Sequence, residues 1–304
     1  MNPFLPVPQP TGSAFLVPIP ESREIPRRGK DDTPGIRPMP APPERIVCLT
    51  EETTETLYLL GEEGRIVGIS GYTVRPERAR REKPRVSAFT HAKTERILAL
   101  EPDLVLGFSD LQAGIAESLV RQGLEVHLFN QRSVAGILAM IANLGALVGC
   151  PERARALVRT LEDGLDEISQ AARLWPRHPT VYFEEWDDPL ISGIGWVSEL
   201  IEIAGGCDSF GDQARHGLAK NRIIADPARV VAADPEIILA SWCGKKFRPE
   251  RLAARPGFAA IRAVASGWVH EIPSSEILQP GPAALTDGIR RIHGLFGRWV
   301  ARYA

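Results

Sequence analysis

Two segments of the chain, 133 residues apart, repeat one pattern of apolar and acidic residues. The first, RILALEPDLVLGF, covers residues 96–108, and the second, RVVAADPEIILAS, covers residues 229–241. Each reads as a helix end, an acid–Pro–acid connector and a buried strand. Because such connectors are common between helices and strands, the connector alone carries little weight. The apolar positions on both sides of it also match, and we therefore predict two lobes built on the same plan.

Strand-like and helix-like segments alternate along the rest of the chain. This order is typical of a mostly parallel sheet, since a helix carries the chain back between neighbouring strands. The predicted fold class is α/β, with two Rossmann-like lobes. The predicted strands cover residues 45–49, 65–70, 103–108 and 125–129 in the first half, and 180–185, 236–241 and 267–272 in the second.

The stretch between the two halves predicts one long helix. Pro151 stands in a suitable first turn, and Leu161, Leu165 and Ile168 fall on one apolar stripe. Residues 1–43 hold 12 of the 26 prolines and few apolar side chains to bury, which is typical of an extended arm. The predicted divisions are an arm at 1–43, a lobe at 44–149, an interlobe helix at 150–175 and a second lobe at 176–304.

Composition argues against several classes of partner. The chain has 36 Lys and Arg against 38 Asp and Glu, a net charge of −2, so it lacks the basic surface that nucleic acid requires. No apolar run approaches the roughly 18 residues of a membrane span.

The four cysteines form no metal-binding spacing, and we expect free thiols. The amino terminus does not resemble a signal peptide, so we expect a cytoplasmic protein, or a periplasmic one if the start is mis-set.

Aromatic residues recur where the predicted strands end. Ligands of open α/β sheets bind beyond the carboxyl ends of the strands. One aromatic residue there more often covers the core than touches a ligand, but several from two lobes favour a broad, flat ligand. The residues at these ends are Tyr72, Phe89, Phe108, Trp186 and Trp242.

Three longer segments resemble one family of proteins. VGISGYTVRPERA, VSAFTHAKTERILALEPDLVLGF and YFEEWDDPLISGIGWVSELIEIAGG are similar to segments of the substrate-binding proteins of ABC importers for cobalamin, haem and iron-siderophores. The resemblance is closest to the cobalamin-binding members. It implies a class III periplasmic-binding-protein-like fold, with two lobes joined by a single long rigid helix. It also implies non-catalytic binding of a corrinoid, such as cobalamin, between the lobes, with haem or a ferric siderophore as the alternative ligand.

The resemblance identifies further candidate contacts with the ligand. Trp196 begins the helix of the segment that opens the second lobe, and Gln279 lies in a loop similar to the one before the family's last helix. His91 and Cys243 stand at predicted edges of the cleft. Imidazole and thiolate both bind cobalt and iron, so either residue is a candidate axial ligand. The alternative is that His91 makes an ordinary hydrogen bond and that Cys243 is a small lining residue.

Two departures from the family concern its permease. Importer-coupled members carry one acidic docking residue on each lobe, and Glu95 fits this role in the first lobe. The repeat offset places Ala228 at the equivalent position of the second lobe, where the second docking carboxylate is missing. Together with the amino terminus, this favours a cytoplasmic corrinoid carrier or store, with a haem or siderophore importer component as the alternative.

A third hypothesis is a chelatase-like enzyme, because two-lobed α/β cores with an interlobe helix also occur there. The sequence has no Gly-rich phosphate loop, no G-x-S-x-G elbow and no H-E-x-x-H pair. Neighbouring carboxylates such as Glu184 and Glu185 point to opposite faces of a strand, so they make poor acid/base pairs. We predict no catalytic residue and no catalytic cofactor.

Overall fold

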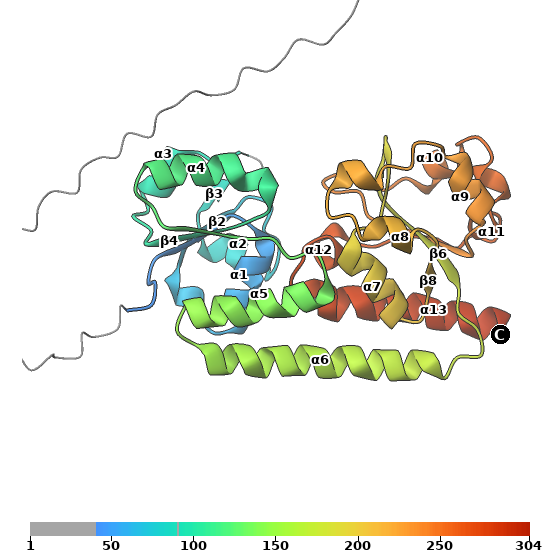
Figure 1. Ribbon diagram of the computed structural model, residues 1–304, viewed down its shortest axis with the longest axis horizontal. Coiled ribbons are helices and arrows are strands. Elements are labelled where there is room, and N and C mark those ends of the chain that lie inside the picture. Colours follow the sequence, from blue (N-terminus) through green and yellow to red (C-terminus); the bar gives the residue numbers. More distant parts are fainter. Residues whose placement is uncertain (1–40, 90) are drawn as a thin grey trace, which may run out of the picture. The chain divides into compact units, whose positions relative to one another are not determined.

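The first lobe, coloured blue to green in Figure 1, is built on a five-stranded parallel sheet in the order β3-β2-β1-β4-β5. The computed structural model describes residues 41–89 and 91–304, so nearly all of the predicted arm at 1–43 lies outside the described residues. The central strands β1 and β4 are buried at every residue, as expected of a parallel sheet covered on both faces. The strands are β1 (Ile46–Cys48), β2 (Ile66–Ser70), β3 (Arg85–Ser87), β4 (Leu104–Phe108) and β5 (Val126–Phe129).

Helices link the strands of this lobe, as the alternating sequence pattern predicts. The last of them, α5, is long and apolar and leads to the connection between the lobes. The helical elements are α1 (Glu51–Leu59), η1 (Glu63–Arg65), α2 (Ala79–Glu82), α3 (Thr94–Leu98), η2 (Asp110–Gln112), α4 (Ala113–Arg121) and α5 (Val134–Leu147).

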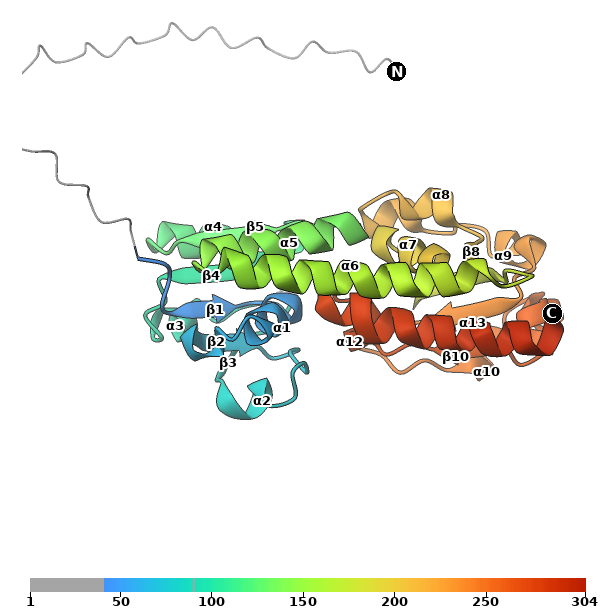
Figure 2. The ribbon, with the colours of Figure 1, turned by 90° about the horizontal axis from the view of Figure 1, so that it is seen from below.

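The predicted long helix is present as α6 (Pro151–Arg173). Pro151 occupies its first turn, and Leu161 and Leu165 are buried on its inner stripe. The helix packs on α5 in the first lobe and on α7 and α13 in the second, so it runs along both lobes (Figure 2). Within the described ranges, no helix has both the length and the apolar character needed to cross a membrane.

The second lobe contains a mixed sheet in the order β10-β9-β6-β7, with β8 also paired to β6. Only β7 runs antiparallel to its neighbour. The strands are β6 (Thr180–Asp187), β7 (Leu190–Ser192), β8 (Cys207–Asp208), β9 (Ile237–Ala240) and β10 (Val269–Glu271). The helical elements are α7 (Gly195–Ile203), α8 (Gly211–Ala214), η3 (Ala219–Arg222), α9 (Ala228–Ala233), α10 (Pro249–Ala253), η4 (Phe258–Ala260), α11 (Arg262–Ala265), α12 (Ser274–Ile277), η5 (Ala284–Gly288) and α13 (Ile289–Tyr303).

The predicted internal repeat is visible in the backbone. Glu101 and Asp234, 133 residues apart, both adopt a left-handed conformation, with φ angles of 45° and 43°. The strand that follows each of them pairs in parallel with the first strand of its own lobe, β4 with β1 and β9 with β6. The acid–Pro–acid connector therefore performs the same turn in both lobes. This confirms the repeat from geometry that is independent of the sequence match.

The two lobes also touch directly, beside the connection through α6. The amide of Gln131 in lobe 1 donates to the carbonyl of Pro280 at 2.8 Å, and the backbone N–H of Ala283 donates to Glu55 at 3.0 Å. Arg75 forms an ion pair with Asp287 at 2.6 Å. These contacts define a seam in which a loop of lobe 2, residues 278–283, lies against α1 and the end of β5.

Candidate functional site

A cavity of about 630 Å³ lies at the boundary of the two lobes. Lobe 1 contributes Arg132 and Ser133, which follow β5, and lobe 2 contributes residues of α7, β8 and α8. The backbones approach closely here, because a Cβ on Gly195 would collide with the carbonyl oxygen of Arg132. Glycine is the residue that permits such an approach. The candidate site is therefore this boundary and the strand ends that border it.

Gln112 holds together the strand ends of lobe 1. Its side chain is fully buried; Oε1 accepts from the backbone N–H of Phe108, and Nε2 donates to the carbonyls of Phe89 and Leu49. Space for the amide exists because residue 107 is glycine, where a Cβ would lie 2.6 Å from Oε1. One side chain thus fixes the loops that follow β1, β3 and β4.

Replacing Gln112 with leucine should lower the free energy of unfolding by about 1–3 kcal/mol, because the buried N–H of Phe108 loses its acceptor. Urea denaturation measures this change. The exposed Gln122 at the end of α4 provides a matched control, and its replacement by leucine should change stability by less than about 0.5 kcal/mol. Equal stability of the two variants would contradict the role assigned to Gln112.

Arg132 is a cation at the cleft edge of lobe 1 that the sequence did not single out. Its guanidinium carbon lies 4.8 Å from the ring centroid of the buried Phe108, and its Nη2 donates to Asn130 at 3.0 Å and to Asp110 at 3.3 Å. Burial is the main cause that lowers the pKa of Arg132. The charge of Arg222 in lobe 2 also lowers this pKa, whereas the carboxylates of Asp110 and of Glu185 in lobe 2 raise it. The side chain therefore lies within electrostatic reach of lobe 2.

Arg222 and Glu185 form an ion pair of lobe 2 whose charges act on Arg132. Arg222 is only 1% exposed; it donates to both oxygens of Glu185, at 2.6 and 3.0 Å, and to the carbonyl of Ser192. Its Nε has no hydrogen-bond partner among the described residues. A buried guanidinium needs such a carboxylate, since an unpaired charge away from water is costly.

Trp242 lies inside lobe 2, contrary to its predicted place at a ligand surface. Its ring is 2% exposed, packs edge-on to Phe247, and donates from Nε1 to Glu184 at 3.1 Å. Glu184 is fully buried and is held at the same time by Arg255. The indole is therefore part of the core of lobe 2, and the prediction that Trp242 contacts the ligand is wrong.

Trp196 is likewise a core residue. It is 3% exposed in α7, and its Nε1 donates to the carbonyl of Ile277 in α12 at 2.8 Å. A tryptophan whose ring and N–H are both satisfied inside the protein has no surface left for a ligand. The prediction that Trp196 contacts the ligand is therefore also wrong, because its ring is buried.

Trp186 remains partly accessible at the end of β6. Its Nε1 donates to the carbonyl of Asp188 at 2.9 Å, and the ammonium of Lys245 lies 5.2 Å from its ring centroid. Lys245 also binds both oxygens of Asp187 at 2.7 Å. The carboxylates around Trp186 are thus mostly partners of lobe 2 cations rather than solvated loop charges.

The other predicted residues occupy varied positions. Tyr72, after β2, is 60% exposed, and Phe89, after β3, is half-buried. His91 is exposed in the loop after β3, and Glu95 is exposed in the first turn of α3. Gln279 is half-buried in the loop of the interlobe seam.

Cys243 follows Trp242 and is exposed, as one of four free cysteines. Desolvation of the thiol and the nearby carboxylate of Glu185 raise its pKa. A raised pKa disfavours the thiolate, which is the form that binds metals. In the part of the chain that the structure describes, no three His, Cys, Asp or Glu side chains are grouped to hold a metal ion.

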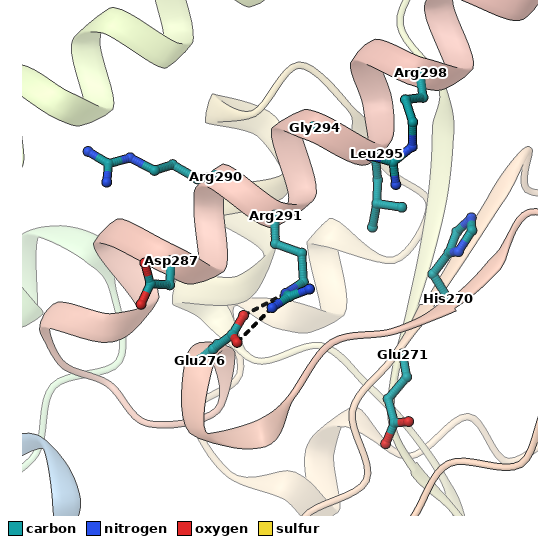
Figure 3. A pocket seen from close by; sticks show the side chains of 9 residues that line it. All are labelled: His270, Glu271, Glu276, Asp287, Arg290, Arg291, Gly294, Leu295 and Arg298. Atoms are coloured by element: carbon teal, nitrogen blue, oxygen red, sulfur yellow. Dashed lines mark hydrogen bonds and ion pairs between the residues drawn. The ribbon is translucent and has the colours of Figure 1, made fainter. Parts of the chain in front are cut away.

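A second cavity, of about 700 Å³, lies between α13 and β10 (Figure 3). Figure 3 shows Arg291 meeting the carboxylate of Glu276, with contacts of 2.6 and 2.8 Å. Burial and the charge of Arg298 lower the pKa of His270 in its wall. Its lining carries charges of both signs, so this cavity lacks the apolar walls that a large flat ligand requires.

Comparison with known proteins relates the chain to a family of binding proteins. Residues 46–276 match the family described as "Periplasmic binding protein". A cobalamin-binding protein of Halobacterium salinarum is 25% identical over 252 residues, which are 79% of this chain and 66% of that protein, slightly under two thirds of its length. A vitamin B12-binding protein of Vibrio campbellii is 25% identical over 203 residues, which are 66% of this chain and 71% of that protein.

Solved structures share the fold. A periplasmic haem-binding protein from Roseiflexus matches with a TM-score of 0.70 at 23% identity, over 83% of this chain and 98% of its own. The periplasmic vitamin B12 binding protein of Vibrio cholerae matches with a TM-score of 0.67 at 21% identity, over 87% of this chain and 100% of its own. At such identities the likeness shows the architecture, namely two α/β lobes joined by one long helix.

Proposed function

Because the chain belongs to the periplasmic binding protein family, we propose that it binds a corrinoid, a cobalamin-like ligand, between its two lobes. Members of this family are binding proteins, and this chain is one of them rather than an enzyme. The names of two similar relatives refer to cobalamin and vitamin B12, which supports a corrinoid over other ligands.

The observation that carries the proposal is the exposed ring of Tyr72 at the end of β2. Tyr72 is 60% exposed, and exposed apolar side chains that form one surface mark binding sites. Phe89 lies after the neighbouring strand β3, and Trp186 at the end of β6 supplies a partly accessible ring from lobe 2. Such rings suit the flat face of a corrin macrocycle.

Haem is the second candidate ligand, and Arg132 is the observation that favours it. A guanidinium at the cleft edge suits the carboxylate of a propionate. The phosphate of a corrinoid with a nucleotide loop offers the same type of charge. Arg132 is therefore a proposed contact for an anionic group in either ligand, with Gln279 and His91 as further proposed contacts.

Binding of cyanocobalamin, hydroxocobalamin, haem and a ferric siderophore should be compared by calorimetry and absorbance. We expect micromolar or tighter binding of a cobalamin, and about tenfold weaker binding for each of Tyr72→Ala and Trp186→Ala, because each loses one stacked ring. Tyr303→Ala, which removes a partly exposed tyrosine from α13, should leave the affinity within twofold. Tighter binding of haem than of either cobalamin would reverse the order of the two candidates.

Coupling to a permease is proposed only for the first lobe. Glu95 is exposed in the first turn of α3, as a docking residue needs to be. Ala228 begins α9, the corresponding helix of lobe 2, and offers no carboxylate. One docking charge in place of two favours a carrier or store over an importer component, and an intact two-site complex with a permease would contradict this.

A further inference from the structure

The seam between the lobes buries a group of three carboxyl side chains. Glu51, Glu52 and Glu55 lie in the first two turns of α1 and are 3%, 1% and 8% exposed. They follow β1, the central strand of lobe 1, and Glu52 and Glu55 contact the loop of residues 278–283 of lobe 2. A Cβ on Gly281 would lie 2.5 Å from the Cβ of Glu52, so the two lobes are in contact at this point.

Arg75, the cation at the seam, pairs with carboxylates other than those of Glu51 and Glu52. Arg75 binds Glu55 at 3.0 Å and Asp287 at 2.6 Å, and Glu55 also accepts from the backbone of Ala283. Glu51 accepts one bond, from the N–H of Val74 at 2.7 Å. No ion pair within the described ranges involves Glu51 or Glu52.

Several buried polar atoms at the seam lack hydrogen-bond partners among the described residues. They include one oxygen of Glu51, both oxygens of Glu52, the hydroxyl of Thr73 and the amide oxygen of Gln131. Burying a carboxylate without a partner is far more costly than burying the neutral acid. This geometry favours the protonated form of Glu51 and Glu52 as long as the lobes are in contact.

We propose that neutral Glu51 and Glu52 hold the seam closed and that their ionisation loosens the contact between the lobes. Burial raises the pKa of Glu51 to about 8 and that of Glu52 to about 7, and the neighbouring carboxylates raise both further. Arg75 faces Glu51, the thiol of Cys48 in β1 faces Glu52, and Asp287 faces their neighbour Glu55. Above these values both side chains carry charge, which repels Glu55 and favours exposure to water.

The sign of the effect follows from the direction of the shifts. When the seam opens, the two carboxyl groups return toward the ordinary pKa of 4.5, so the open form releases protons. A rise in pH from about 6 to 9 therefore favours the open form. If the proposed ligand binds between closed lobes, its affinity should fall over the same range, and this second consequence rests on the proposed function.

Hydrogen exchange of the ligand-free full chain tests the seam without any assumption about the ligand. The N–H of Ala283, bonded to Glu55, reports on the contact directly. After correction for the intrinsic pH dependence of exchange, protection of residues 278–285 should fall at least tenfold between pH 6 and 9. The Glu51→Gln/Glu52→Gln variant should keep its protection over this range, because neither amide can ionise.

Glu95→Gln provides a matched control, since it removes an exposed carboxylate of the same lobe. This variant should lose protection as the unaltered protein does. Constant protection in the unaltered protein would overturn the proposal, and so would an equal loss in the Glu51→Gln/Glu52→Gln variant. Because no ligand is present, failure of this test is distinguishable from failure of the corrinoid assignment.

Discussion

Replacing Glu184 with alanine is expected to lower the free energy of unfolding by about 3–5 kcal/mol, the largest loss we predict for a single side chain. Glu184 is fully buried in β6 and accepts from Arg255 at 2.5 and 3.0 Å, from Trp242 at 3.1 Å and from Tyr182 at 3.2 Å. Its removal leaves a mostly buried guanidinium and two buried donors without their acceptor. Urea or guanidinium denaturation measures the change.

The exposed pair Arg121–Glu117 on α4 is a matched control for Glu184. Its partners lie 2.8 Å apart, but both are solvated, so Glu117→Ala should change the free energy of unfolding by less than about 0.5 kcal/mol. The two variants thus remove the same functional group from opposite environments. A loss below about 1 kcal/mol for Glu184→Ala would show that its buried network adds little to stability.

Replacing Glu52 with glutamine is expected to stabilise the protein at alkaline pH. Burial raises the pKa of Glu52 from 4.5 to about 7, so the folded protein holds this proton between those values while the unfolded chain releases it. The stability of the unaltered protein therefore falls as pH rises through this window and levels off above about pH 7. A shift of this size corresponds to about 3 kcal/mol at pH 8.

The glutamine variant lacks this titration, so its gain in the free energy of unfolding should be near zero at pH 4.5 and about 3 kcal/mol at pH 8. Denaturation curves at a series of pH values test the prediction. Glu95→Gln should show no comparable gain at any pH, because its side chain is exposed. A gain for Glu52→Gln that is the same at pH 4.5 and pH 8 would contradict the ionisation of Glu52.

The burial of the carboxyl side chains at the seam could not be predicted from the local sequence pattern. The run EETTET reads as an acidic helix start, which is an ordinary solvated feature at the amino end of a helix. Its burial results from contact with residues more than 200 positions later, at Gly281 and Ala283. No periodicity within α1 carries information about that distant loop.

The acidic run around Trp186 illustrates the same limit. Its carboxylates find partners at Arg222, Lys245 and Arg255, which are 37 to 71 positions away. Gln112 and Arg132 were missed for a related reason. Each acts through backbone groups or charges of other strand ends, and a single polar residue in a loop has no local signature for that role.

The sequence alone determined the architecture of this protein. Apolar strands, amphipathic helices and a connector repeated at a constant offset are local features, and local features fix which elements form and in what order. The tertiary structure alone decided which strand-end residues are accessible. Trp196 and Trp242 turn inward while Tyr72 stays exposed, because the direction of a ring depends on the space and the hydrogen-bond acceptors that other elements leave for it.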